Sequence, residues 1–115
     1  MQRPLAAATD EVAFGAMSAL RENGLLIPRD VSVVGFDDVV MSAHSDPPLT
    51  TIHVPARELG LAAWRLLNAD DVAVGPRGQR VAGDLVVRGS TAAPRDAVPA
   101  GAASAGRADT PATSQ

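Results

Sequence analysis

Residues 31–36 read Val-Ser-Val-Val-Gly-Phe, a short apolar run rich in β-branched side chains. The run lies between Pro28 and the acidic pair Asp37-Asp38. Runs of this kind are typical of strands buried on both faces, which occur in parallel sheets covered by helices. The central Val-Val pair also requires a neighbouring strand on each edge. We therefore expect residues 30–36 to form an inner strand of a larger sheet.

Two amphipathic helices are predicted, one before and one after this strand. Residues 10–23 carry an apolar stripe at helical spacing, formed by Ala13, Ala16, Met17 and Leu20. Thr9 is a suitable N-cap for this helix, and Gly24 a suitable end. After Pro55 a second stripe covers residues 56–68, formed by Leu59, Ala62, Ala63, Leu66 and Leu67. Helices that alternate with buried strands indicate the α/β class with parallel strands.

The remaining segments complete the predicted organisation. Residues 39–44 favour a short helix, and residues 50–54 and 81–88 favour two further strands. From Ser90 onward the chain is dominated by small and polar residues, which cannot bury enough apolar area to offset the entropy of ordering. We therefore divide the chain into a truncated lead-in (1–8), one domain (9–92) and a disordered tail (93–115). Three strands are too few for a doubly wound sheet, so the domain is predicted to be incomplete.

Composition excludes several classes of function. The net charge is -3, which argues against a nucleic-acid binder with its own basic surface. The absence of cysteine excludes disulfides and thiolate metal sites. Neither an export signal nor a membrane-length apolar run is visible, so we expect a cytoplasmic protein that does not enter membranes. We expect no metal, because His44 and His53 share no helical phase, and no cofactor.

No catalytic arrangement is recognisable. Ser42, His44 and Asp46 have the residue types of a hydrolytic triad, but they are too close in sequence for its geometry, and a Gly-x-Ser-x-Gly turn is absent. Gly35-Phe36-Asp37 is not a phosphate-binding loop. The chain is therefore predicted not to be an enzyme.

Four strings of residues together resemble the lac repressor (LacI/GalR) family of transcription regulators. They are Ala-Thr-Asp-Glu-Val-Ala-Phe-Gly-Ala-Met at 8–17, Pro-Arg-Asp-Val-Ser-Val-Val-Gly-Phe-Asp-Asp at 28–38, Pro-Pro-Leu-Thr-Thr-Ile at 47–52 and Leu-Val-Val-Arg-Gly-Ser-Thr at 85–91. Members of that family join a helix-turn-helix to a two-subdomain sensor built like a periplasmic sugar-binding protein. The resemblance covers the C-terminal part of that sensor, so it implies a partial, periplasmic-binding-protein-like (type I) α/β fold.

The same resemblance points to candidate effector-binding residues. Asp37 comes just after the carboxyl end of the inner strand, where open α/β sheets place their ligands. A carboxylate there can accept two hydrogen bonds from vicinal sugar hydroxyls, and the family's corresponding aspartate contacts the effector. The alternative is that Asp37 or Asp38 caps the helix that follows. Thr9 and Asp10 are also candidates for effector contact, although Thr9 equally suits helix capping and Asp10 equally suits a first-turn charge.

The family's sensors pair as homodimers, and the resemblance places Phe14, Met17, Met41 and His44 at that interface. Met17 also belongs to the apolar stripe, which favours a core position, whereas Phe14 lies off the stripe. The implied partners are a small-molecule effector such as a sugar, a second copy of the chain, and operator DNA through an N-terminal domain that these residues do not include. Two alternatives remain: part of a sugar-binding transport protein, or a fragment that pairs with intact regulators.

Overall fold

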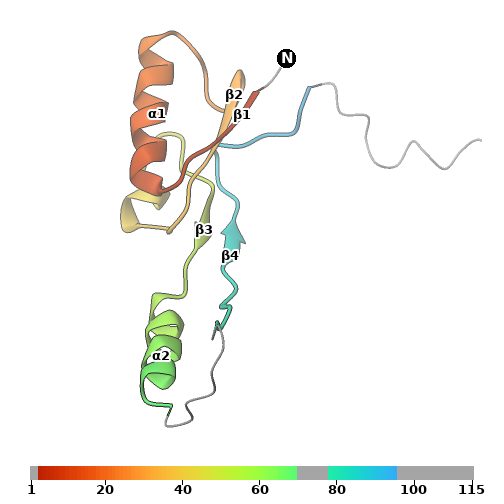
Figure 1. Cartoon of the computed structure of the whole chain (residues 1–115). Helices are drawn as coiled ribbons and strands as arrows, with labels where there is room; N and C mark the ends of the chain where they lie inside the picture. Colours follow the sequence, from red (N-terminus) through yellow and green to blue (C-terminus); the bar gives the residue numbers. More distant parts are fainter. Residues whose placement is uncertain (1–2, 70–77, 96–115) are drawn as a thin grey trace, which may run out of the picture.

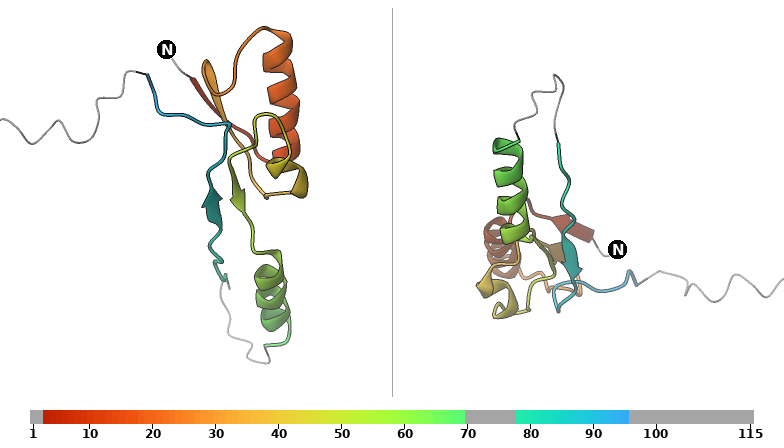
Figure 2. Two further views of the ribbon diagram at one scale, coloured as in Figure 1. Left: turned by 180° about the vertical axis from the view of Figure 1, so that it is seen from behind. Right: turned by 90° about the horizontal axis from the view of Figure 1, so that it is seen from below.

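The computed structural model describes residues 3–69 and 78–95. Along these residues the elements are strand β1 (Arg3–Ala6), helix α1 (Asp10–Glu22), strand β2 (Val31–Val34), 3-10 helix η1 (Val40–Ala43), strand β3 (Thr51–His53), helix α2 (Ala56–Leu67) and strand β4 (Asp84–Val86). Helix α1 covers one face of the β1–β2 pair (Figure 1). Strands β3 and β4 run side by side away from that pair, and α2 stands at the far end of their ribbon (Figures 1 and 2).

Helix α1 begins and ends as its sequence predicts. The hydroxyl of Thr9 accepts a hydrogen bond from the amide of Val12 at 3.3 Å, which satisfies one of the free amides of the first turn. Gly24 follows the helix with a φ of 74°, a conformation that costs glycine little because it has no Cβ. The prediction that Thr9 caps this helix is confirmed.

Strand β2 has partners on both edges. On one edge β1 pairs with it in parallel, and Leu5 lies opposite Val33. On the other edge the amide of Val33 donates to the carbonyl of Ser90 at 2.9 Å, and the amide of Gly35 donates to the carbonyl of Thr50 at 2.9 Å. Strand β2 thus has a paired strand on one edge and single-residue contacts from Thr50 and Ser90 on the other.

Two segments near the predicted domain boundaries contact β2. Residues 1–8 are not merely a lead-in, because β1 within them supplies the parallel neighbour of β2. Ser90, the first residue of the stretch of small and polar residues, is fully buried, and its hydroxyl donates to the Val33 carbonyl at 2.6 Å. Both segments gain their structure from contacts with β2, which is distant in sequence. The predicted tail beyond residue 95 lies outside the described residues.

The second pair of strands differs from the first in direction. Strands β3 and β4 are antiparallel, and Ile52 lies opposite Leu85. The expected parallel arrangement holds for β1 and β2, whereas β3 and β4 lead toward α2 and back again (Figure 1). This ribbon joins the two parts of the described fold.

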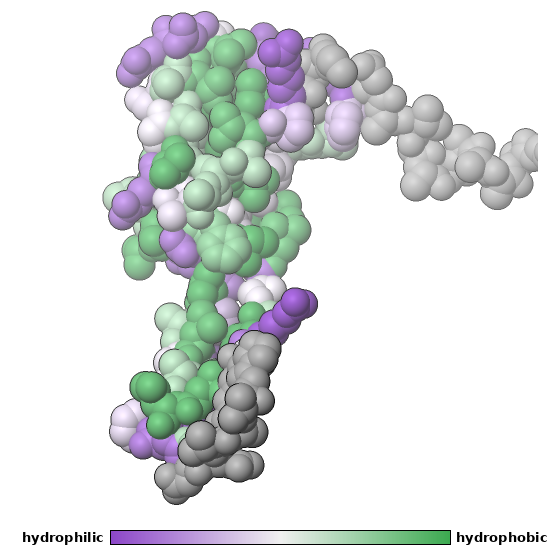
Figure 3. Space-filling view, in the orientation of Figure 1, coloured by the Kyte–Doolittle hydropathy of each residue, from purple (hydrophilic) through white to green (hydrophobic). Residues whose placement is uncertain are grey.

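The core lies between α1 and the β1–β2 pair. Its buried members are Ala13, Met17, Val31, Val33 and Leu49. Helix α2 is packed far less completely: Ala62 is buried, but the side chains of Trp64 and Leu67 are 64% and 82% exposed. Apolar surface is accordingly visible toward the α2 end of the molecule (Figure 3). No helix among the described residues has the length and apolar character required to cross a bilayer.

Candidate functional site

Asp37 lies beyond the carboxyl end of β2, at the position predicted from the sequence. Its side chain is exposed, and its amide donates to the carbonyl of Ile52 in β3 at 3.0 Å. The backbone takes positive φ values at two successive residues, 123° at Asp37 and 60° at Asp38. Non-glycine residues rarely adopt such conformations unless surrounding contacts hold them. The carboxylate of Asp37 is thus presented to solvent by a backbone that is anchored on both sides.

Thr9 belongs to the same edge of the sheet. The amide of the next residue, Asp10, donates to the carbonyl of Phe36 at 2.9 Å, so the start of α1 is joined to the residue before Asp37. Thr9 is half-buried, and its hydroxyl caps α1. A hydroxyl has two acceptor lone pairs and one donor hydrogen, so capping leaves part of its hydrogen-bonding capacity free.

Asp10 is fully buried, which the sequence did not reveal. Its Oδ2 accepts hydrogen bonds from the Ser42 hydroxyl at 2.6 Å and the Val39 amide at 2.9 Å, and its Oδ1 accepts one from the Thr51 hydroxyl at 2.5 Å. Burial raises the pKa of the Asp10 carboxyl, but these hydrogen bonds outweigh it and hold the pKa below its usual value. The side chain is engaged within the chain, so it has a structural role in place of the predicted effector contact.

The buried carboxylate of Asp10 shapes the loop that carries Asp37. It joins the first turn of α1 to η1 and β3, and Asp37 lies in the segment between β2 and η1. Gly35 is required beside it, because a Cβ at that position would overlap Asp10 Oδ1 and lie 2.9 Å from Leu49 Cδ2. The close approach of α1 to the end of β2 therefore depends on glycine.

Asp38 is held by two basic side chains that were not predicted to belong to the site. Its Oδ1 lies 2.8 Å from Arg88 Nη2, and its Oδ2 lies 3.0 Å from His53 Nδ1. The Arg88 hydrogen bond is the main reason that the pKa of Asp38 lies below its usual value; burial opposes it, and the His53 hydrogen bond lowers the pKa further. Arg88 was visible in the string Leu-Val-Val-Arg-Gly-Ser-Thr, but nothing local indicated a partner 50 residues earlier.

The residues predicted at a dimer interface have different environments. Met17 is 1% exposed and belongs to the core, which favours the core position that its place on the apolar stripe also indicates. Phe14 is half-buried against the same core. Met41 is 59% exposed, and His44 is exposed. For Phe14, Met41 and His44 the interface stays a prediction.

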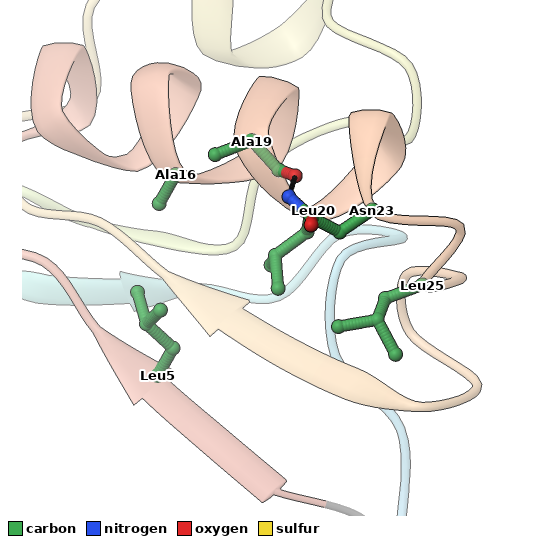
Figure 4. Close-up of a pocket in the computed structure, with 6 residues that line it drawn as sticks. All are labelled: Leu5, Ala16, Ala19, Leu20, Asn23 and Leu25. Carbon is green, nitrogen blue, oxygen red and sulfur yellow. Dashed lines mark hydrogen bonds between the residues drawn. The ribbon is translucent and has the colours of Figure 1, made fainter.

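An apolar cavity lies away from Asp37. It has a volume of about 300 Å³ and opens between β1, α1 and the loop after α1 (Figure 4). Its wall is formed by Leu5, Ala16, Ala19, Leu20, Asn23 and Leu25. These side chains offer one polar group, from Asn23, whereas sugar sites combine apolar walls with several placed polar groups. This cavity is poorly suited to a polyhydroxylated ligand.

A family model of the periplasmic binding protein-like domain matches residues 2–91. The chain belongs to this family. The match includes β1, in agreement with the structure. The transcriptional regulator MalR of Streptomyces coelicolor is 49% identical over 87 residues, which make up 74% of this chain and 25% of that protein. The resemblance to lac repressor-type regulators is thereby confirmed.

Solved structures of the lac repressor and of LacI family regulators give the same result. The lac repressor dimer bound to operator and the anti-inducer ONPF is 37% identical, with a TM-score of 0.68 over 78% of this chain and 32% of that one. A LacI family regulator from Enterococcus faecium with bound ribose is 34% identical, with a TM-score of 0.61 over 77% of this chain and 34% of that one. The chain spans about a quarter of the length of the curated relatives that align over most of it.

Proposed function

We propose that these residues form part of the effector-sensing domain of a LacI-type transcription regulator and that Asp37 contacts the effector. The observation that carries the proposal is the exposed carboxylate of Asp37 at the carboxyl end of β2, on a backbone held in an uncommon conformation. Ligands of open α/β sheets bind at this end of the strands. A carboxylate fixed there is a suitable acceptor for two neighbouring hydroxyl groups.

Thr9 is the second proposed contact, because its hydroxyl lies at the N-terminus of α1 on the same sheet edge. Asp10 supports these contacts indirectly, because its buried carboxylate holds Val39, Ser42 and Thr51 around the loop that carries Asp37. The effector class we favour is a sugar, since a regulator with the same fold has been solved with ribose. The names of the relatives describe transcriptional regulators, which favours a cytoplasmic regulator over a transport protein.

The proposal is tested by titrating the full chain with ribose and a panel of other monosaccharides and disaccharides, with calorimetry and backbone NMR as readouts. Asp37→Asn removes the charge at nearly constant shape and is expected to weaken sugar binding by about tenfold or more, as for a lost charge-assisted hydrogen bond. Asp46→Asn is the matched control, because Asp46 is also exposed and lies near Arg21 in another part of the fold. Equal affinities for wild type and Asp37→Asn would remove Asp37 from the site, and a panel without any binder would overturn the sugar assignment.

The partners of the whole regulator follow from the same proposal. Homodimerisation would use Phe14, Met41 and His44, and operator binding would use a separate helix-turn-helix. The chain of 115 residues has a net charge of -3 and is expected to bind no operator by itself. A gel-shift experiment at near-physiological salt checks this, and specific DNA binding by this chain would contradict it.

A further inference from the structure

The backbone at Asp37 and Asp38 needs external support, and the contacts that supply it come from the β3–β4 ribbon. The φ values of 123° and 60° lie outside the common regions for residues with a Cβ. Such conformations persist where neighbouring groups hold them. Asp37 is held through its amide by the Ile52 carbonyl of β3, and Asp38 through its carboxylate by Arg88 and His53.

Arg88 makes the most extensive of these contacts. It lies two residues beyond β4, and its Nη2 donates to Asp38 Oδ1 at 2.8 Å while its Nη1 donates to the Leu49 carbonyl at 3.0 Å. Its own amide donates to the Thr50 hydroxyl at 2.9 Å. The side chains of Arg88 and Asp38 are 20% and 16% exposed, so solvent screens their interaction little. The planar guanidinium thus fixes the Asp38 carboxylate against the backbone before β3.

We propose that Arg88 is a positioning residue, which orients Asp37 through Asp38 and makes effector affinity depend on the placement of the β3–β4 ribbon. This inference rests on the proposed function of Asp37. The ribbon leads from the α1–β1–β2 layer to α2, which stands apart from that layer (Figures 1 and 2). A displacement of the ribbon would move Arg88 and the Ile52 carbonyl together, and both hold the Asp37-Asp38 backbone. By linkage, a ligand bound at Asp37 would in return favour one placement of the ribbon.

The first test needs no ligand and uses NMR hydrogen exchange on the full chain. Arg88→Met keeps the aliphatic length and removes the guanidinium, and it is expected to speed exchange of the Asp37 amide by roughly tenfold through local opening. The Ala7 amide, which donates to Val34 in the β1–β2 pair, is the internal reference and should change by less than about twofold. Arg88→Lys keeps the positive charge but lacks the planar guanidinium. Its exchange rate at the Asp37 amide should lie between those of wild type and Arg88→Met. Arg57→Met, at an exposed arginine of α2, is the matched control and should leave both amides unchanged.

If exchange of the Asp37 and Ala7 amides is accelerated equally, the chain has lost stability in general and the positioning role is overturned. An unchanged exchange rate at Asp37 would also overturn it. The double variant Asp38→Asn/Arg88→Met should exchange at Asp37 no faster than Asp38→Asn alone, because Arg88 acts through the Asp38 carboxylate; a further acceleration would contradict that route.

The second test separates this inference from the proposed function. Wild type and Arg88→Met are titrated with ribose, or with whichever sugar of the panel binds, and Arg88→Met is expected to bind about fivefold to tenfold more weakly. If wild type binds no sugar, the proposed effector class fails, and the exchange of the Asp37 amide still decides the positioning role. If both proteins bind the sugar equally, the proposed function stands and the positioning role of Arg88 is overturned.

Discussion

Replacing Asp10 tests whether a buried carboxylate organises the loop at the end of β2. Asp10→Ala would remove the acceptor of three donors: the hydroxyls of Ser42 and Thr51, both 0% exposed, and the amide of Val39. A buried donor left without a partner costs about 1–3 kcal/mol. The hydroxyls can rotate toward other acceptors, so we assign each the lower figure of about 1 kcal/mol, and we assign the fixed amide about 2 kcal/mol. The sum predicts that the free energy of unfolding falls by about 4 kcal/mol.

The measurement is urea denaturation of the full chain, followed by far-UV circular dichroism, which reports on α1. Trp64 fluorescence would not serve, because that side chain is 64% exposed on α2. Small domains have total stabilities of about 5–15 kcal/mol, so Asp10→Ala is expected to keep only about 1 kcal/mol of stability if the chain lies at the low end of that range. Thr51→Val removes one donor and keeps the others, with an expected loss of about 1.5–3 kcal/mol for a hydrogen bond to a charged group. Asp46→Ala, at an exposed aspartate, should change stability by less than about 0.5 kcal/mol.

The pH dependence gives an independent check of the same carboxylate. The pKa of Asp10 is lowered in the folded chain, so the folded state favours the charged form. Its contribution to stability is therefore fully present above about pH 4, the ordinary pKa of an aspartic acid, and is lost as the pH falls through the lowered folded pKa. The stability difference between wild type and Asp10→Asn should be constant from neutral pH to about pH 4 and should narrow below it. A loss below about 1 kcal/mol for Asp10→Ala, or a difference that widens on acidification, would refute the reasoning.

Three further substitutions test local geometry by urea denaturation. Thr9→Ala removes the acceptor for the Val12 amide and should cost about 1 kcal/mol, whereas Thr9→Ser should stay close to wild type; equal losses would argue against capping. Gly24→Ala should cost about 1–2 kcal/mol for its φ of 74°, since no atom lies within 4 Å of the new Cβ. Gly35→Ala should lower the free energy of unfolding by about 1–3 kcal/mol, because the new Cβ overlaps Asp10. If the losses of Gly35→Ala and Asp10→Ala simply add in the double variant, that cause is contradicted.

Helix α1 could be predicted in detail because its signals are local. Thr9 and Gly24 occur where a cap and a terminating residue are needed, and the apolar stripe between them has helical spacing. The candidate Asp37 could be placed for a similar reason, since a ligand position follows from the end of a buried strand. In each case a few adjacent residues carry the information.

The residues that hold Asp37 in place could not be predicted, because their partners are distant in sequence. Asp10 in a first helical turn indicates a favourable interaction with the helix dipole, and its burial depends on Ser42 and Thr51, which lie 32 and 41 residues away. Arg88 likewise meets Asp38 across 50 residues. Hydrogen bonds between residues so far apart in sequence depend on how α1, β3 and the end of β4 pack together. The periodicity of apolar residues carries no information on that packing.

Strand β1 shows the same principle at the level of the fold. Arg-Pro-Leu-Ala contains no β-branched residue, and Pro4 lacks an amide hydrogen, so the segment has weak strand character of its own. The segment forms a strand because β2 provides a parallel partner. Proline is tolerated there because β1 is an edge strand of this two-stranded sheet. The opposite edge of β2 is completed by Thr50 and Ser90, the second of which lies beyond β4. The placement of Asp37 at the tip of β2 therefore depends on segments from both ends of the family match.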